Sequence, residues 1–439
     1  MRVGCILLLL LVGCDEKRKR LPSGAVPSAT ASVTATSNVT ASATPSASTR
    51  ATSSSSTALA PVASARAFDA GASLCRLTYG PASLPFVGAP TAAIDEGDVA
   101  IVFNDRGTPR VARTPWNVPA TAPPAAAAVD AVGTNSPACA VAGPRAFCAS
   151  VDRVYSASIR GMAPQRATVT ANRARGPVAA AALGERTLVT WLEERTTTEG
   201  PRAVAVGRVD TGEPFAVSDD GSGATWIDAA PRPHDTPPRI TLVSIDARTS
   251  MVPVHVRDVR VGPDGKADLS RDVVVAVGGA PSSGVRVQVG GAAREAPFVL
   301  FADAKDVRDF GLSLIRLDEP YKEEAQRVWR VYPNGLDPAP VAATQGARAA
   351  YVAFARPENP SGKPVVVEVA RITEHGVLTT LALSTSSDAP TDLSLVVDPR
   401  DALWLVTVGV HKATLERWEC PPASFLPPLR SGQALDPGR

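Results

Sequence analysis

The chain has 439 residues, and its 45 lysine and arginine residues against 43 aspartate and glutamate residues give a formal net charge of +2 at pH 7. Much of this positive charge lies at Arg2 and between Lys17 and Arg20, so the rest of the chain is near neutral, which argues against a nucleic-acid partner. Aromatic residues make up 5% of the chain, too few to indicate a stacking platform for bases or sugars.

The first fourteen residues have the form of an export signal. Arg2 precedes an apolar run from Ile6 to Val12, which is far shorter than the roughly 20 residues needed to span a bilayer and fits the apolar region of a signal peptide. The run ends in Leu11-Val12-Gly13-Cys14, which resembles the lipobox of bacterial lipoproteins. This resemblance implies that residues 1–13 are removed and that Cys14 becomes a lipid-bearing N-terminus, for example a palmitoylated one. The alternative is a signal peptide cut elsewhere, with Cys14 an ordinary cysteine.

Residues 14–67 change abruptly in composition, because serine, threonine, alanine and proline dominate from Pro22 to about Ala65. The segment has hardly any large apolar side chains, so burial cannot offset the entropy lost on ordering it. We therefore predict a disordered tether after the lipidated cysteine. A flexible chain of this length spans about 40 Å, which holds the following domain clear of a bilayer.

Residues 68–422 are predicted to fold, and this length is large for one core unless the architecture repeats. Short apolar runs do recur, each entered through a polar turn or a turn with glycine or proline. The seven runs are residues 98–103, 145–149, 186–191, 239–244, 296–301, 348–354 and 401–406. Their centres are 42 to 58 residues apart, near the period of propeller blades.

Further strand signals accompany several of these runs. Short stretches of small or apolar residues precede them at 179–183, 341–343 and 393–397, and alternating segments follow at 203–209, 311–317 and 365–372. Residues 263–265, 333–335 and 374–376 supply hairpin turns, and no window of twelve residues has a convincing helical period. The sequence therefore predicts an all-β fold with a single β-propeller of seven blades, six or eight being the alternatives, and then a tail at 423–439.

Two segments resemble motifs of known propellers. Ser218, Asp220, Gly223 and Trp226 fall in a stretch that resembles the Asp-box hairpin of sialidase-like propellers, with one extra residue before Gly223. Residues 398–405 are similar to the Asp-x-x-Gly-x-Leu-Trp core of sensor-type bacterial propellers, with Asp401 in place of the glycine. Both motifs are structural in those families, where the aspartate accepts backbone hydrogen bonds in its own turn and the tryptophan packs between strands.

The sequence contains no pattern that indicates a catalytic, cofactor-binding or metal-binding residue. His234, His255, His375 and His411 lie outside metal-ligand spacing of one another and of cysteine, and we interpret them as solvated or packed side chains. Glycoside hydrolysis needs two carboxyl groups across the sugar, and the acidic residues near strand ends are candidates: Asp95, Glu96, Asp98, Glu193, Glu194, Glu323 and Glu324. Residues 193–195 and 322–324 are interpreted instead as solvated loops. A sialidase-like enzyme would also place three arginines and a tyrosine with an acidic partner at the axis.

Four cysteines, Cys75, Cys139, Cys148 and Cys420, remain once the signal peptide is removed and Cys14 is acylated, and an even count outside the cytosol predicts two disulfides. Sequence alone allows three pairings. Cys139 and Cys148 flank Gly143-Pro144 in a predicted hairpin, which favours a local bond. A propeller closes by bringing its first and last strands into one blade, which favours the bond from Cys75 to Cys420.

Two functions fit this sequence. The preferred one is a membrane-tethered, non-catalytic binding or scaffold lipoprotein of the bacterial cell envelope, with a protein or glycan partner on a propeller face. Its membrane, outer or inner, and its side, periplasmic or surface-exposed, stay open. The alternative is a glycan-processing, sialidase-like hydrolase or a degenerate relative of one. An axial cluster of arginines and carboxylates would favour the enzyme, and a channel lined by small residues would favour the scaffold.

Overall fold

A computed structural model describes a large part of the predicted folded region. The described residues are 74–84, 88–105, 108–117, 126–128, 139–149, 153–160, 167–170, 173–197, 200–210, 212–218, 223–233, 235–246, 252–278, 287–290, 298–304, 310–317, 329–332, 340–346, 349–357, 365–372, 378–386 and 389–421. The lipobox with Cys14, the predicted tether and the tail at 423–439 lie outside them. Every regular element in these ranges is a β-strand, which confirms the all-β prediction.

The described strands pair into seven antiparallel sheets, and most neighbouring strands within a sheet are consecutive in the sequence. The first comprises β2 (Pro90–Asp95), β3 (Asp98–Asp105), β4 (Thr108–Pro115) and β5 (Ala126–Ala128), and the second β6 (Ala140–Ala142), β7 (Arg145–Ala149), β8 (Arg153–Ser158) and β9 (Ala167–Thr170). The third comprises β10 (Ala174–Leu183), β11 (Arg186–Thr197), β12 (Gly200–Val209) and β13 (Phe215–Ala216). The fourth comprises β14 (Ala224–Arg232), β15 (Arg239–Asp246), β16 (Val252–Val261), β17 (Ala267–Leu269) and β18 (Val273–Gly278).

The remaining three sheets follow the same order. The fifth comprises β19 (Val287–Gly290), β20 (Phe298–Ala304), β21 (Phe310–Arg316) and β22 (Trp329–Tyr332), and the sixth β23 (Val341–Gln345), β24 (Ala350–Pro357), β25 (Val365–Ile372) and β26 (Leu378–Ser386). The seventh comprises β27 (Asp392–Val397), β28 (Leu403–Val408), β29 (Ala413–Glu419) and, from the other end of the chain, β1 (Arg76–Leu84).

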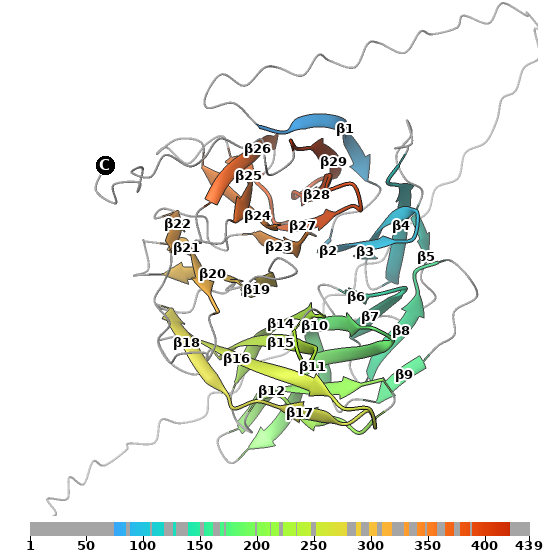
Figure 1. The fold of residues 1–439 in the computed structure, drawn as a ribbon, viewed down its shortest axis with the longest axis vertical. Helices are drawn as coiled ribbons and strands as arrows, with labels where there is room; N and C mark the ends of the chain where they lie inside the picture. The colour runs from blue at the N-terminus through green and yellow to red at the C-terminus, as the bar shows by residue number, and fades with distance from the viewer. Residues whose placement is uncertain are drawn as a thin grey trace, which may run out of the picture. The chain divides into compact units, whose positions relative to one another are not determined.

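The sheets are arranged as a ring around an axis (Figure 1). The first strand of each sheet contacts the first strand of the next, from β2 through β6, β10, β14, β19 and β23 to β27, and β27 contacts β2 again. Each of the seven apolar runs overlaps the second strand of one sheet. These observations confirm a β-propeller, and its seven sheets agree with the predicted number of blades, whereas a blade count over the whole chain stays a prediction.

Burial on both faces explains why the second strands are nearly continuous apolar runs. In β11, Leu188 and Leu192 belong to the core shared with the fourth sheet, while Val189 and Trp191 belong to the core shared with the second sheet. A sheet that packs on both faces needs apolar residues at every position instead of at alternate ones. The propeller is therefore held together by layers of aliphatic side chains between neighbouring sheets.

One strand from the N-terminal end closes the ring. β1 pairs with β29 in antiparallel fashion, so that Arg76 lies opposite Glu419 and Leu84 opposite Ala413, with register shifts on either side of Tyr79. Gly80 makes the close approach possible, because its φ is +88° and a Cβ there would lie 2.3 Å from the carbonyl oxygen of Leu415. At the axis, Ala92 N donates to Ser394 Oγ over 2.8 Å and links the first sheet to the last.

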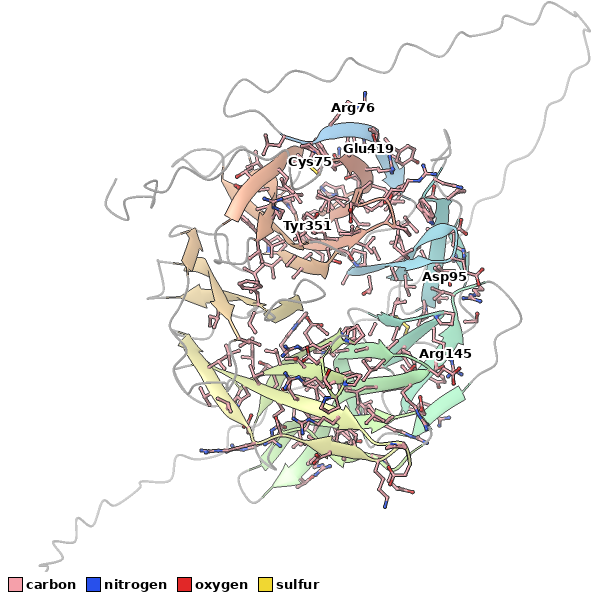
Figure 2. The ribbon with its side chains drawn as sticks, in the orientation of Figure 1. Cys75, Arg76, Asp95, Arg145, Tyr351 and Glu419 are labelled. Atoms are coloured by element: carbon pink, nitrogen blue, oxygen red, sulfur yellow. A yellow bond between two sulfur atoms is a disulfide. The ribbon has the colours of Figure 1, made fainter. Side chains whose placement is uncertain are left out.

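Both predicted disulfides are present. Cys75 bonds to Cys420 across 345 residues of sequence, directly beside the ends of β1 and β29, and Figure 2 shows Cys75 with Arg76 and Glu419 at this closing sheet. Cys139 bonds to Cys148 across the hairpin of β6 and β7, whose turn contains Gly143 at a φ of +55°.

The structure corrects one sequence interpretation. Residues 193–195 do not form a solvated loop, because β11 continues through them to Thr197. The Glu193 side chain is 7% exposed, and its Oε1 accepts a hydrogen bond of 3.1 Å from Trp191 Nε1. Glu193 can lie within the strand because β11 pairs with β12 and because Trp191 donates a hydrogen bond to its carboxylate. Residues 322–324 lie outside the described ranges.

We predict that the two disulfides contribute unequally to stability. A disulfide lowers the conformational entropy of the unfolded chain, and a longer closed loop gives a larger stabilisation. The expected stabilisation is about 5 kcal/mol for the bond from Cys75 to Cys420 and roughly 2 to 3 kcal/mol for the bond from Cys139 to Cys148. Urea denaturation of Cys75→Ala/Cys420→Ala and Cys139→Ala/Cys148→Ala, the second pair serving as a matched control, should reproduce this order. Equal losses would contradict the closure argument.

Candidate functional site

An axial cavity of about 250 Å³ lies among the first strands of the sheets. Its described lining consists largely of alanine, valine, leucine and proline, with Asp228 of β14 and Asp392 of β27 as its charged residues. No arginine belongs to this described lining. Across the cavity wall, Thr91 Oγ1 donates to the carbonyl oxygen of Cys139 and links β2 to the start of β6. The described lining thus consists mainly of small residues, the kind of channel that the sequence led us to expect for a scaffold.

A larger groove of about 740 Å³ opens between the third and fourth sheets. The turn from β10 to β11, the proline-rich connection from β14 to β15 and the hairpin of β16 and β17 form its walls. Residues 263–265 make that hairpin turn, as predicted, and Gly265 N donates to the carbonyl oxygen of Gly262 over 2.9 Å. The groove is lined by Leu183, Gly184, Arg186, Pro233, Pro237, Pro238, Arg260, Val261, Gly262, Pro263, Asp264, Lys266, Ala267 and Asp268.

Arg186 bridges the two sheets that form the groove. Its Nη1 lies 3.0 Å from Asp210 Oδ2 within the third sheet, and its Nη2 donates to the carbonyl oxygen of Pro263 in the fourth sheet over 3.3 Å. The Lys266 side chain at the rim is 87% exposed, and its Nζ lies 3.7 Å from Asp264 Oδ2. The groove therefore combines solvent-exposed charge with apolar surface that is continuous with the core between the sheets.

Several acidic candidates from the sequence form ion pairs between sheets. Asp95, at the end of β2, has a side chain that is 3% exposed and lies 3.1 Å from Arg113 Nη1 and 3.0 Å from Arg160 Nη2. Arg113 also binds Asp98 at 2.9 Å, and Arg160 binds Glu96 at 2.8 Å. Arg160 follows β8 in the second sheet, so the cluster joins the first two sheets. These carboxylates serve as structural anions, and no sequence spacing indicated their arginine partners.

Two of the four histidines are described. His255 lies in β16, where its Nδ1 is 2.8 Å from Asp272 Oδ2, and His411 is exposed in the turn between β28 and β29. His234 and His375 lie outside the described residues. Among the residues that the structure describes, no group of three or more histidine, cysteine, aspartate and glutamate side chains is placed to hold a metal ion.

The Asp-box-like segment lies between two sheets. Ser218 follows β13 of the third sheet, and Gly223 and Trp226 lie at the start of the fourth, while Asp220 is outside the described residues. Ser218 Oγ accepts a hydrogen bond of 2.8 Å from Ala205 N, which ties the segment back to β12. An Asp-box hairpin would join two strands of one sheet, whereas this segment connects the third sheet to the fourth.

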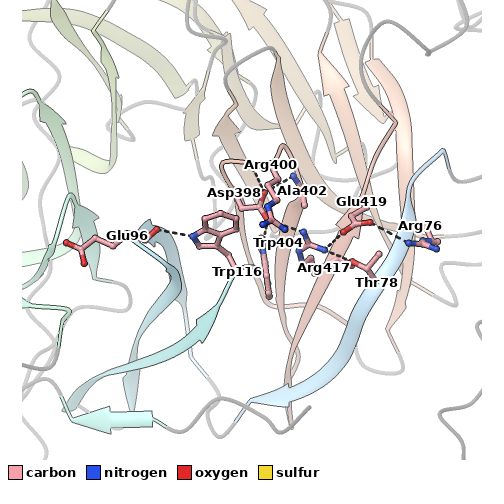
Figure 3. Close-up of polar contacts among 10 residues, drawn as sticks. All are labelled: Arg76, Thr78, Glu96, Trp116, Asp398, Arg400, Ala402, Trp404, Arg417 and Glu419. Atoms are coloured by element: carbon pink, nitrogen blue, oxygen red, sulfur yellow. Dashed lines mark hydrogen bonds and ion pairs between the residues drawn. The ribbon is translucent and has the colours of Figure 1, made fainter. Parts of the chain in front are cut away.

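Residues 398–405, which are similar to the core of sensor-type propeller repeats, form their own turn, as that resemblance implied (Figure 3). Asp398 Oδ1 accepts hydrogen bonds of 2.8 Å from Arg400 N and 3.0 Å from Ala402 N. Asp398 Oδ2 accepts one of 3.1 Å from Nε1 of Trp404, which is fully buried. Asp401 has a φ of +64°, the conformation that the usual glycine adopts without strain. The motif is therefore structural in this chain.

Arg417 connects the same turn to the closing strand. Its Nη2 lies 3.4 Å from Asp398 Oδ2, and its Nη1 lies 2.5 Å from Glu419 Oε1 and donates to Thr78 Oγ1 over 3.0 Å (Figure 3). The Arg417 side chain is 6% exposed and the Asp398 side chain fully buried. The sequence indicated the aspartate and the tryptophan of this network but not the arginine, because β29 carries no signal that identifies its partner.

A buried carboxyl group also connects the last two sheets. Glu416 of β29 accepts hydrogen bonds of 2.8 Å from Ser384 Oγ in β26 and 3.1 Å from Trp418 Nε1. Burial raises the pKa of the Glu416 carboxyl group above its usual value, although these two hydrogen bonds act in the opposite direction.

Comparisons with known proteins give fold-level likeness alone. The chain matches no protein-family model and no curated protein. Among solved structures, BBS1N in complex with ARL6DN is 12% identical with a TM-score of 0.47, covering 80% of this chain and 98% of that one. The Dos1 propeller is 9% identical with a TM-score of 0.44, covering 75% and 77%. Regucalcin, a calcium-binding protein from Agrobacterium tumefaciens, is 10% identical with a TM-score of 0.39, covering 78% and 94%. The propeller assignment rests on the strand order and ring contacts given above.

The described part of the chain contains no helix that is long and apolar enough to cross a membrane.

Removal of the Asp398 carboxylate is predicted to destabilise the protein strongly. Asp398→Ala leaves the turn amides and the Trp404 N–H without an acceptor and the buried Arg417 without one of its anions, at a cost of roughly 3 to 5 kcal/mol. Asp401→Gly, a matched change in the same turn that relieves the positive φ, should alter stability by at most about 1 kcal/mol. Urea unfolding of both variants measures the difference, and a small loss in Asp398→Ala would contradict the proposed structural role.

The raised pKa of Glu416 predicts a pH-dependent cost. Between the ordinary glutamate pKa of about 4.5 and the raised folded value, the unfolded chain has released a proton that the folded chain still holds, so stability falls as pH rises. Glu416→Gln does not titrate, and its amide can still accept from Trp418 and donate to Ser384. The unfolding midpoint of this variant should therefore increase relative to that of wild type as the pH rises above about 4.5. A constant difference across this range would contradict the prediction.

Proposed function

We propose that this chain is a membrane-tethered, non-catalytic binding or scaffold lipoprotein of the bacterial cell envelope. A lipid on Cys14 anchors it, residues 14–67 act as the tether, and the propeller offers its faces to a protein or glycan partner. The observation that supports this most is the ring itself, which is closed at its N-terminal strand and carries two disulfides. Structural disulfides persist in compartments outside the cytosol, which fits export by the predicted signal peptide.

The surface of the propeller supports binding more than catalysis. The described lining of the axial cavity consists mainly of small residues, whereas the groove between the third and fourth sheets is about three times larger and open to solvent. A groove of this volume, with apolar walls and a few charged side chains, is typical of a binding site. No cofactor enters this proposal.

Lipidation is tested with Cys14→Ser. We expect wild type to incorporate radiolabelled fatty acid and to sediment with membranes, and the variant to lose both properties because the acylated thiol is absent. Cys5→Ser is the matched control, since it changes a cysteine inside the predicted signal peptide and should leave both unchanged. Wild type without fatty acid would overturn the lipoprotein assignment.

Binding is tested by cross-linking in intact envelopes. A photoreactive group at Lys266 samples the groove rim, and one at Lys412, in the turn between β28 and β29, samples the opposite face, because successive turns of an antiparallel sheet alternate between its two ends. A discrete adduct from Lys266 and none from Lys412 would support the groove as the binding surface. Glycan hydrolysis by the purified protein that Asp392→Asn abolishes would instead favour the hydrolase.

A further inference from the structure

The Cys75–Cys420 disulfide changes the path that a mechanical load takes through the chain. Cys75 directly precedes β1 and Cys420 directly follows β29, and their Cα atoms are 4.1 Å apart. Residues 1–74 lie before the bond and residues 421–439 after it. A force between these two terminal segments can therefore pass from Cys75 to Cys420 without entering residues 76–419.

We propose that this disulfide carries a force between the two terminal segments in place of the propeller. Residues 76–419 then form a covalently closed loop through which that force does not pass. The proposal depends on the disulfide and the strand order alone and holds whether or not Cys14 carries lipid. It gives the closing bond a mechanical role in addition to its contribution to thermodynamic stability.

The pairing of β1 with β29 determines how the closed ring would respond to such a force if the disulfide were absent. Because β1 and β29 are antiparallel, the N-terminal end of β1 and the C-terminal end of β29 lie at the same end of their ladder. A force applied there loads the pairs one at a time, beginning with Arg76 and Glu419. Their ion pair is 3.5 Å long with side chains 81% and 46% exposed, and an exposed ion pair contributes little.

Beyond this first pair the ladder is irregular. Register shifts interrupt the pairing between Leu77 and Tyr79 and between Tyr79 and Ala82, so the load would meet an irregular ladder soon after the first pair opens. Each backbone hydrogen bond contributes far less than a covalent bond. Without the disulfide, a modest force should strip β1 from the seventh sheet and open the ring.

Single-molecule stretching of the full chain, with handles at its two ends, tests this proposal. The oxidised wild-type protein should show no unfolding of the propeller, since residues 76–419 carry no load. Cys75→Ala/Cys420→Ala should release a contour length of about 120 nm, at 3.3 to 3.6 Å per residue. Cys139→Ala/Cys148→Ala is the matched control and should behave as wild type, because the short loop lies outside the load path.

Two further measurements keep the result decisive. A handle at Glu185, in the exposed turn between β10 and β11, forces load into the ring and should release about 40 nm when paired with the N-terminal handle, even with the disulfide intact. If the double variant does not fold, wild-type molecules reduced with a thiol after folding replace it. A release of about 120 nm from oxidised wild type between its ends, or no release after reduction, would overturn the proposal.

Discussion

The closure of the ring is the constraint on which the other contacts depend. Each sheet packs against two neighbours, and this holds for the first and last sheets only because β27 contacts β2 at the axis and β1 completes the seventh sheet. If that closure were absent, the apolar layers on both sides of the gap would face water, and burial of apolar surface is the main favourable term in folding. The hydrogen bond from Ala92 to Ser394, the pairing of β1 with β29 and the Cys75–Cys420 bond all act at this boundary.

Polar networks complement these apolar layers where neighbouring sheets meet near their turns. Asp95 with Arg113 and Arg160 joins the first two sheets, and Glu416 with Ser384 joins the last two. Such groups are costly to bury alone and become acceptable because each has partners with good geometry. They constrain how the sheets that they join are oriented toward each other, which aliphatic packing alone specifies less strictly.

The sequence predicted the second strands best, since a strand buried on both faces and paired on both edges is apolar at nearly every position, as in residues 403–408. It also predicted both disulfides, because the propeller topology brings Cys75 and Cys420 together. β1 was missed, because an outer strand has half-exposed side chains and its sequence contains Gly80-Pro81. Residues 193–195 were wrongly assigned to a loop, since nothing in their charge pattern reveals that Trp191 satisfies Glu193. The partners of Asp95 and Asp398 depend on side chains distant in sequence, which local patterns do not encode.

The origin of the closing strand has a consequence for the timing of folding. β1 is synthesised first and its partner β29 last, so the final sheet cannot be completed until nearly the whole chain is available. Contacts between such distant segments form slowly, because the entropy of closing a long loop is lost before the contacts can stabilise the chain. During this interval the outer edge of β29 is unpaired, and an open strand edge can pair with another chain. A molecule that loses its N-terminal segment to proteolysis before closure would therefore keep an adhesive edge permanently.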